Sequence, residues 1–306
     1  MKALKFAIGL LVSLGRLMAV ELGDTRESVV AEKGQPVGTM TGGGLEILRY
    51  ADLTIRLRDG RVVGIEKTAA RPPPAPQPGT AAKDQAKGTG AAAAPDFPRR
   101  FVGIPEFHTR RGTQSAGTAF LARRPNNPQV YILTVHHLLG PDGGFAELIP
   151  HDQVPSFVLG IRIDELFGQP TWHDVAGCNV PAGGDPDGPL ADLAVFKTSG
   201  VADSQPAVLA FALPAIGDSV WVIAHVRGGV PEGMFIHHAT VTENAGQWLV
   251  CEFENPQIVT NGASGAPVIN GGGQVVGIYR GHADENGRKY AFIIPSTLIL
   301  KTLQGL

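Results

Sequence analysis

Residues 262–268 read Gly-Ala-Ser-Gly-Ala-Pro-Val and form a glycine-rich bend around one serine, just before an apolar strand. The small residues on both sides of Ser264 let the backbone fold tightly enough for the N–H groups of Gly262 and Ser264 to converge on one point. Convergent backbone N–H groups stabilise the oxyanion that develops in acyl transfer. Together with the two motifs described next, the bend predicts a nucleophilic serine beside an oxyanion hole.

Two earlier motifs carry the groups that such a serine needs. Residues 133–137 read Leu-Thr-Val-His-His at the end of an apolar strand, and residues 192–197 read Asp-Leu-Ala-Val-Phe-Lys. A hydroxyl nucleophile requires an imidazole that accepts its proton and a buried carboxylate that orients the imidazole. Asp185 and Asp187 compete with Asp192 for the second role, but neither precedes an apolar strand.

These motifs in series resemble the trypsin-like (chymotrypsin-fold) serine peptidases, and especially the bacterial Deg/HtrA-like branch. The matching stretches follow the family's order through residues 99–306: GTAFL, ILTVHHLL, DLAVFK, NGASGAPV, GGGQVVGI and FIIPS. The resemblance implies a serine endopeptidase without a cofactor, acting on a polypeptide substrate. It assigns His137 as general base, Asp192 as its orienting carboxylate and Ser264 as nucleophile, and it makes Gly262 and Ser264 the oxyanion donors.

The choice between two adjacent histidines follows from the same resemblance. The family's Thr-x-x-His spacing, counted from Thr134, falls on His137. His136 then stands where a small residue is usual, and a proton on His136 would repel a charged His137. Adjacent residues in a strand point to opposite faces, so His136-His137 and His237-His238 are poor chelators and we expect no metal site.

Substrate specificity is read from residues near the bend. The resemblance places Ile258, six residues before the nucleophile, at the base of the primary pocket, with Tyr279, Arg280 and Gly281 on its wall. None of these is a carboxylate, which favours a substrate with a small or medium apolar side chain. The alternative is that Ile258 is a core residue.

The segment that carries the motifs is predicted to consist of short strands. Closed antiparallel barrels are favoured because closure removes exposed strand edges. We therefore expect a mainly β fold, a double antiparallel β-barrel preceded by a small α+β module and a disordered linker. One helix is expected at 296–303, capped by Ser296 or Thr297, with no PDZ module after it. The strands are expected at 117–122, 130–134, 193–197, 220–226, 247–253, 266–269, 275–279 and 290–294.

The small α+β module is predicted at residues 21–68. A helix is expected over 23–34, begun by Asp24 or Thr25 and ended by Gly34. Three strands and an Asp59-Gly60 hairpin turn follow, with the strands at 46–50, 54–57 and 62–65. The stretches LGDTRESVVAEKGQP and LTIRLRDGRVVGIE resemble the BamE/SmpA-like modules of bacterial envelope proteins. The resemblance implies a binding or positioning module with an envelope protein partner; a solubilising appendage is the alternative.

Residues 69–98 are predicted as a Pro/Ala/Gly-rich linker. Through residue 95 this stretch has no large aliphatic or aromatic side chain, so it has little to bury that would offset the entropy of ordering. We expect the two flanking domains, 21–68 and 99–306, to lie roughly 30 Å apart without a fixed orientation.

Residues 1–20 resemble a secretory signal peptide in pattern. Lys2 and Lys5 precede the largely apolar run 6–14, which is too short to span a bilayer. We expect export to the periplasm or the cell exterior and no transmembrane span. The net charge of −2 gives no general attraction to phosphate, so no nucleic-acid partner is expected.

The two cysteines, Cys178 and Cys251, allow one disulfide at most, and nothing in their surroundings demands it. The fold must therefore rest on its hydrophobic core. A different function class also stays open at this point, because a fold does not guarantee its chemistry. The alternative is a catalytically inactive peptidase-fold binding or adaptor protein of the cell envelope.

Overall fold

The computed structural model describes most of the chain, namely residues 20–36, 38–42, 45–50, 53–67, 93–179, 188–199, 205–244 and 246–304. The predicted signal peptide, apart from residue 20, and most of the predicted linker lie outside these ranges. Among the helices in these ranges, none is long and apolar enough to cross a membrane.

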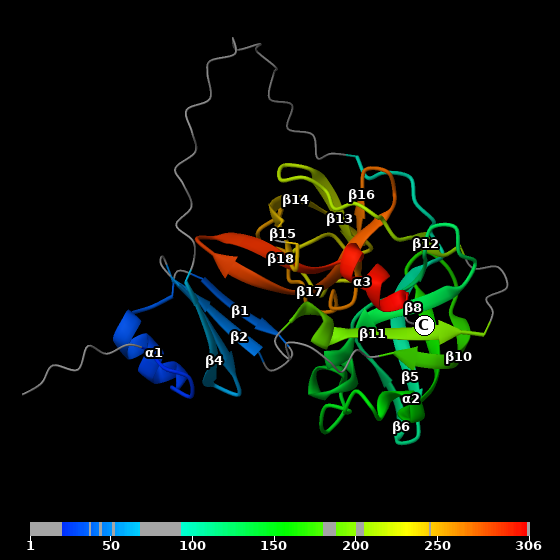
Figure 1. Ribbon diagram of the computed structural model, residues 1–306. Coiled ribbons are helices and arrows are strands. Elements are labelled where there is room, and N and C mark those ends of the chain that lie inside the picture. Colours follow the sequence, from blue (N-terminus) through cyan, green and yellow to red (C-terminus); the bar gives the residue numbers. More distant parts are fainter. Residues whose placement is uncertain are drawn as a thin grey trace, which may run out of the picture.

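The first of two closed antiparallel barrels is formed by strands between residues 102 and 198 (Figure 1). Its strands are β5 (Val102–Thr109), β7 (Ala119–Arg123), β8 (Val130–Val135), β9 (Val158–Glu165), β10 (Thr171–Asn179) and β11 (Leu193–Thr198). The ring runs β7-β8-β11-β10-β9-β5 and closes where β5 pairs with β7. Flanking elements are β6 (Gly112–Ser115), β12 (Ala207–Val208) and α2 (Val154–Phe157).

The second barrel has the same closed form. Its strands are β13 (Ser219–Ile223), β14 (Ile236–Asn244), β15 (Leu249–Phe253), β16 (Pro267–Asn270), β17 (Val275–Glu285) and β18 (Arg288–Pro295). The ring runs β16-β13-β14-β15-β18-β17 and closes where β16 pairs with β17. The expectation of a mainly β double barrel is confirmed.

One helix, α3 (Ser296–Leu303), follows the last strand at the predicted position. The predicted cap is wrong, because Pro295 is the N-cap and no side-chain cap is made. The hydroxyl of Ser296 instead donates to the carbonyl of Ala210 at 2.8 Å. The hydroxyl thereby joins the helix to the segment before the second barrel.

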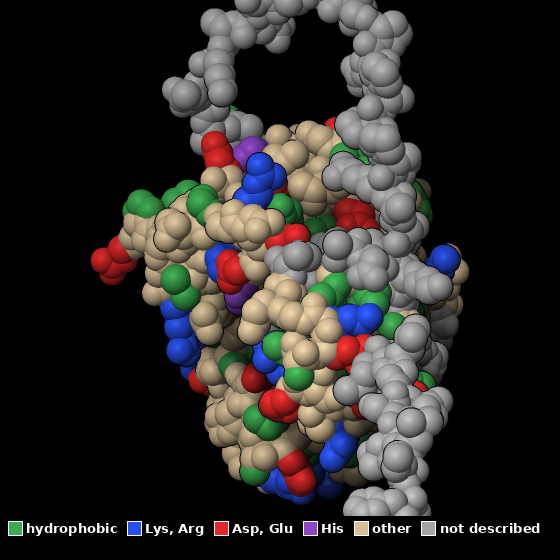
Figure 2. Space-filling view, turned by 90° about the vertical axis from the view of Figure 1, so that its left-hand side faces the viewer, with side chains coloured by type: hydrophobic (Ala, Val, Ile, Leu, Met, Phe, Trp, Pro, Cys, Tyr) green, Lys and Arg blue, Asp and Glu red, His purple; other side chains and the backbone are tan. Residues whose placement is uncertain are grey.

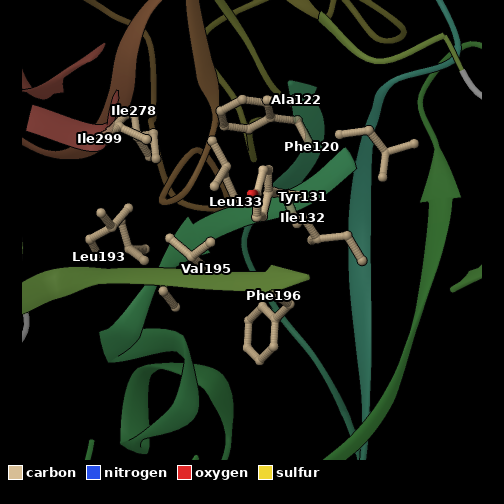
Figure 3. Close-up of a cluster of buried hydrophobic side chains, with 14 of the residues drawn as sticks. Phe120, Ala122, Tyr131, Ile132, Leu133, Leu193, Val195, Phe196, Ile278 and Ile299 are labelled. Carbon is tan, nitrogen blue, oxygen red and sulfur yellow. The ribbon is translucent and has the colours of Figure 1, made fainter. Parts of the chain in front are cut away.

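The two barrels share one hydrophobic cluster. Figure 3 shows Leu133 and Val195 of the first barrel near Ile278 of β17 and Ile299 of α3, all buried. Burial of aliphatic and aromatic side chains is the main favourable term in folding. This shared cluster fixes the barrels against each other and so fixes the loops that meet between them.

The N-terminal module is a helix with four strands. These elements are α1 (Arg26–Lys33), β1 (Gly38–Gly42), β2 (Leu45–Arg49), β3 (Leu53–Arg58) and β4 (Arg61–Lys67). Thr25 caps α1 by accepting the N–H of Ser28, and Gly34 ends the helix, as expected. Asp59 and Gly60 both have positive φ, 51° and 75°, which confirms the hairpin turn. Strand β1 was not predicted.

Strand β1 corrects the expectation that the module has no fixed orientation. It pairs antiparallel with β17, with Thr39 facing Asp284, Met40 facing Ala283 and Thr41 facing His282. The sheet of the second barrel therefore continues through β1, β2, β3 and β4 (Figure 1). Composition predicted a linker at 69–98 but gave no sign that the module would join the barrel edge.

The end of the predicted linker also belongs to the peptidase part. The side chain of Phe97 is buried in the shared cluster, and its ring meets that of Phe101 edge-on at 6.0 Å. The last residues of the predicted linker, 69–98, therefore include one that contributes to the hydrophobic core of the barrels, where burial of an aromatic ring is favourable.

The face that carries the N-terminal module has charges of both signs. Figure 2 shows Lys and Arg side chains interspersed with Asp and Glu side chains on that face, with no large patch of one sign. Interspersed charges give no extended field toward a polyanion or a polycation.

Candidate active site

His137 and Asp192 are brought together by the pairing of two strands. His137 lies in the short 3₁₀ helix η1 (His136–Leu139) after β8, and Asp192 ends the 3₁₀ helix η3 (Pro189–Asp192) before β11. Val135 at the end of β8 faces Leu193 at the start of β11. The residues just outside these strand ends therefore meet at one rim of the first barrel.

The carboxylate of Asp192 holds His137 at two points. Its Oδ2 accepts from the ring Nδ1–H at 2.8 Å, and its Oδ1 accepts from the backbone N–H at 2.8 Å. Both side chains are buried. An ionised carboxylate only accepts, so the proton lies on Nδ1 and the ring's Nε2 is left as an acceptor.

Arg280 is a third member of this buried cluster. Its Nε donates at 2.8 Å to Asp192 Oδ2, the oxygen that also receives the imidazole, and its guanidinium lies 5.4 Å from the centre of the Trp248 ring. Burial opposes ionisation of Asp192, but the neighbouring His137 and Arg280 outweigh it and hold the pKa of this carboxyl well below its usual range. Asp192 is therefore ionised at neutral pH.

The loop that carries Ser264 is attached to both barrels. Thr118, just before β7, donates its N–H to the Ser264 carbonyl at 2.8 Å and its hydroxyl to the Gly262 carbonyl at 2.7 Å. On the other side the N–H of Gly265 donates to the Tyr279 carbonyl at 2.8 Å. The serine thus lies in a loop fixed at both flanks.

Two glycines in this loop are required by its backbone. Gly262 has φ of 98° and Gly265 has φ of 88°, a region that residues with a Cβ rarely adopt. A Cβ on Gly265 would lie 2.0 Å from the Thr118 carbonyl oxygen. The tight bend predicted from the sequence is confirmed in its backbone geometry.

The two expected oxyanion donors differ from their neighbours. Ala263 and Gly265 donate their N–H groups to Thr260 and Tyr279. Among the hydrogen bonds of the described residues, none uses the N–H of Gly262 or Ser264. These two N–H groups are therefore available to an incoming acceptor.

Ser264 and His137 line the same cleft, of about 890 Å³, between the barrels. Gly117 and Leu138 contribute from the first barrel and Gly262 from the second. Within the described residues the hydroxyl of Ser264 and the ring of His137 are not hydrogen-bonded. Catalytic hydrogen bonds in unliganded enzymes are often long and tighten when substrate binds.

The predicted specificity residues divide into two groups. Tyr279, Arg280 and Gly281 line the cleft. Ile258 does not line it: the side chain is 1% exposed in the hydrophobic cluster of the second barrel, which is the core alternative. The Tyr279 side chain is buried as well and packs against Phe253, so Tyr279 presents mainly its backbone to the cleft. The inference of an apolar specificity pocket based on Ile258 therefore loses its support.

His136 has no charge with which to repel His137 at neutral pH. Its side chain is buried, its Nε2–H donates to the Ile149 carbonyl at 2.7 Å, and its ring lies 4.0 Å from that of His151. Burial first, and His151 second, lower the pKa of His136 to about 4. The expected perturbation by like charge therefore has no source at neutral pH.

Several site residues were not found from the sequence. Thr118 belongs to the GTAFL stretch, but its hydrogen bonds to the serine loop were not predicted. Arg280 was placed on the pocket wall, whereas its side chain binds Asp192. A buried cation requires a carboxylate partner, and this requirement could have indicated the pair. Glu46, Asp59 and Gly60 of the N-terminal module also line the cleft, and no sequence pattern pointed to this.

Both cysteines are unpaired. Cys178 lies half-buried in β10 and Cys251 is buried in β15, so they belong to different barrels. Burial raises the pKa of Cys178 to about 12. In the described part of the chain no three His, Cys, Asp or Glu side chains form a group able to hold a metal ion.

Two closed six-strand barrels with a histidine, an aspartate and a serine gathered around the cleft between them define the chymotrypsin-like class of serine peptidase folds. The model of the trypsin-like peptidase domain matches residues 117–278, more than half of the chain. The chain therefore belongs to the trypsin-like peptidase family.

Among solved structures, the chain is similar to the Rv3671c protease of M. tuberculosis in its active form. The identity is 17%, the match covers 69% of this chain and 87% of the other, and the TM-score is 0.44. It is also similar to a serine endoprotease from Yersinia pestis at 18% identity, with 68% and 63% of the two chains covered and a TM-score of 0.42. A third similar structure is the HtrA-type protease AlgW with a tripeptide, at 18% identity, 68% and 60% coverage and a TM-score of 0.41. No curated protein matches the chain.

Proposed function

We propose that this chain is an exported serine endopeptidase that hydrolyses peptide bonds through an acyl-enzyme. The proposal rests on one observation: Asp192 accepts two hydrogen bonds from His137, and His137 lines the same cleft as Ser264. Such an imidazole keeps its Nε2 free and correctly turned to accept a proton. The N-terminal Lys-rich and apolar run supports export.

The proposed reaction has two halves. The Oγ of Ser264 attacks the substrate carbonyl while Nε2 of His137 takes the hydroxyl proton, and the oxyanion accepts from the N–H groups of Gly262 and Ser264. The C–N bond then breaks as Nε2 returns the proton to the leaving amine. In the second half, water attacks the acyl carbonyl while Nε2 of His137 takes its proton. The ester C–O bond then breaks as Nε2 returns that proton to the Oγ of Ser264, and the acid product leaves. Asp192 stays ionised throughout and stabilises the imidazolium.

Labelling by a fluorophosphonate probe tests this proposal. We expect the probe to attach to the folded protein and the Ser264→Ala variant to remain unlabelled, because the probe reports an activated serine hydroxyl. Ser156→Ala, a change at an exposed serine outside the cleft, serves as the matched control and should label like the parent. Folded protein without Ser264-dependent labelling would instead favour the inactive binding or adaptor alternative.

A further inference from the structure

The outer edge of β17 is shared by two strands with a gap between them. On one side β17 pairs with β18 along its length, from Gly277 to Glu285. On the other side β16 pairs with residues 275–278, and β1 pairs with residues 282–284. Within the described residues, no strand pairs with Arg280 or Gly281 on this second side.

The gap opens at the reacting serine. Arg280 and Gly281 line the same cleft as Ser264, and the serine loop is bonded to the adjacent Tyr279 through the N–H of Gly265. An unpaired strand edge is a template for another extended chain, which gains main-chain hydrogen bonds there. An extended polypeptide that pairs with the gap would therefore pass beside Ser264.

Strand β1 lies in the path of such a polypeptide. At roughly 3.3 Å per residue, the two-residue gap admits about 7 Å of extended chain before the edge is taken by β1. The turn residues Asp59 and Gly60, with Glu46 of β2, wall the same cleft. A longer extended chain must leave the edge of β17 at His282 or displace β1 from it.

The contact of β1 with β17 is short. In the described part of the chain, three facing residue pairs join the two strands. The module keeps a hydrophobic cluster of its own, drawn from residues 20–62 alone, so it does not depend on the barrel for its core. Release of β1 from β17 would therefore leave that cluster intact.

We propose that the N-terminal module is a built-in gate, in which β1 competes with the substrate for one strand edge. The occupant that displaces β1 is an extended segment of unfolded polypeptide longer than the two-residue gap. Short substrates fit in the gap and leave β1 in place. This inference rests on the proposed function, because it concerns access to Ser264.

A reversible cross-link tests the gate in the full chain. Thr39 and Asp284 face each other across β1 and β17, and facing residues in antiparallel strands have the Cα separation that a disulfide requires. The variant Thr39→Cys with Asp284→Cys is compared oxidised and reduced. The matched control, Thr39→Ser with Asp284→Ser, loses the same side chains, including the bond from Lys289 to Asp284, but does not cross-link.

Three rates are measured for each form: cleavage of a carboxymethylated unfolded protein, cleavage of a blocked dipeptide ester and fluorophosphonate labelling of Ser264. Oxidation should lower cleavage of the unfolded protein by about tenfold or more, because it removes the open fraction of molecules. Oxidation should change the rates of ester cleavage and of labelling little. Reduction should restore the rate on the unfolded protein. The three rates of the serine control should not depend on the oxidant.

The outcomes separate the gate from the enzyme. The gate is wrong if Ser264 labels normally and the oxidised and reduced forms cleave the unfolded protein at the same rate. This includes the case in which neither form cleaves it. The module would then be a fixed part of the cleft. A faster rate in the oxidised form also contradicts the gate. If the reduced form does not label at Ser264, the proposed peptidase function fails instead.

Discussion

At the scale of single residues, the site contains Arg280 in addition to His137, Asp192 and Ser264. One oxygen of Asp192 serves both the imidazole of His137 and the guanidinium of Arg280, each at 2.8 Å. The guanidinium neutralises part of the charge that would otherwise stabilise protonated His137. Arg280 touches no reacting atom, so we regard it as a positioning residue.

Replacing Arg280 should change the pH dependence of the reaction. In Arg280→Ala the undiminished charge of Asp192 favours the imidazolium, so the acid limb of kcat/KM should move to higher pH. Arg280→Lys keeps a cation and should shift the limb less. The pH–rate profiles of the three proteins provide the measurement. A loss of kcat in Arg280→Ala with an unmoved acid limb would mean that Arg280 only supports the fold.

The predicted site residues that the structure brings together at the cleft are those whose chemistry follows from a local motif. Gly262 and Ser264 follow from the need for small residues in a tight bend, and Asp192 follows from its place at the start of an apolar strand. Ile258 was misplaced because its position was counted along the chain from Ser264, whereas the loop between them turns the side chain into the barrel core.

At the scale of elements, the serine loop of the second barrel depends on the start of β7 in the first. Thr118 contributes two hydrogen bonds to that loop, and its own carbonyl accepts from the hydroxyl of Thr134 at 2.7 Å. This chain of bonds reaches from β8, next to His137, to the oxyanion donors. The proposed base, His137, and the proposed nucleophile, Ser264, are therefore connected through the hydrogen bonds of Thr118.

Thr118→Val should slow catalysis while leaving the fold intact. Valine keeps the shape but removes the hydroxyl, so the carbonyl of Gly262 loses its partner and the loop loses one restraint. A buried group left without its partner costs about 1–3 kcal/mol. Where the transition state bears this cost, kcat falls by roughly five- to 160-fold. Steady-state kinetics on one ester substrate provide the measurement.

The matched control is Thr302→Val in α3, where the lost bond, to the Leu298 carbonyl, is far along the chain from the site. This control should keep the parent's kcat. If Thr118→Val also keeps the parent's kcat, Thr118 does not position the serine loop.

Elements were predicted well where apolar residues are continuous and poorly where they alternate with polar ones. β8 and β11 are buried along nearly their whole length and were found. β9 and β14 alternate buried with exposed or half-buried residues and were missed. β5 contains Pro105, which argues against a central strand although the strand forms here.

At the scale of the whole molecule, buried histidines make stability depend on pH. Burial lowers the pKa of His136 to about 4, and burial is also the main cause of the lowered pKa of His173, His237 and His282. In the unfolded chain these groups titrate near 6.5. Between these values the unfolded state binds more protons, so protonation favours unfolding.

The free energy of unfolding should therefore fall as the pH drops from about 7 to about 4.5. His136 alone accounts for on the order of 3 kcal/mol over the full window down to its folded pKa. His136→Gln keeps a donor for the Ile149 carbonyl but does not titrate, so its decline should be shallower. Urea denaturation of both proteins at the two pH values provides the measurement. An equally steep decline in His136→Gln would contradict this assignment.

The arrangement of the parts was the least predictable feature. Strand order within the barrels follows from a family pattern, but the pairing of β1 with β17 has no local signal, since Gly38–Gly42 is short and rich in glycine. The strand pairs with β2 of its own module on one side and with β17 of the second barrel on the other. Sequence periodicity describes what one segment buries and not which distant edge it meets.

The unpaired cysteines have a consequence for how the protein is made. Each thiol is satisfied by its own barrel, so the native state needs no oxidative step and no disulfide isomerase. Whether the chain folds before or after it leaves a reducing compartment, the same core forms. We therefore expect the two barrels to fold without a disulfide in a reducing as well as in an oxidising compartment.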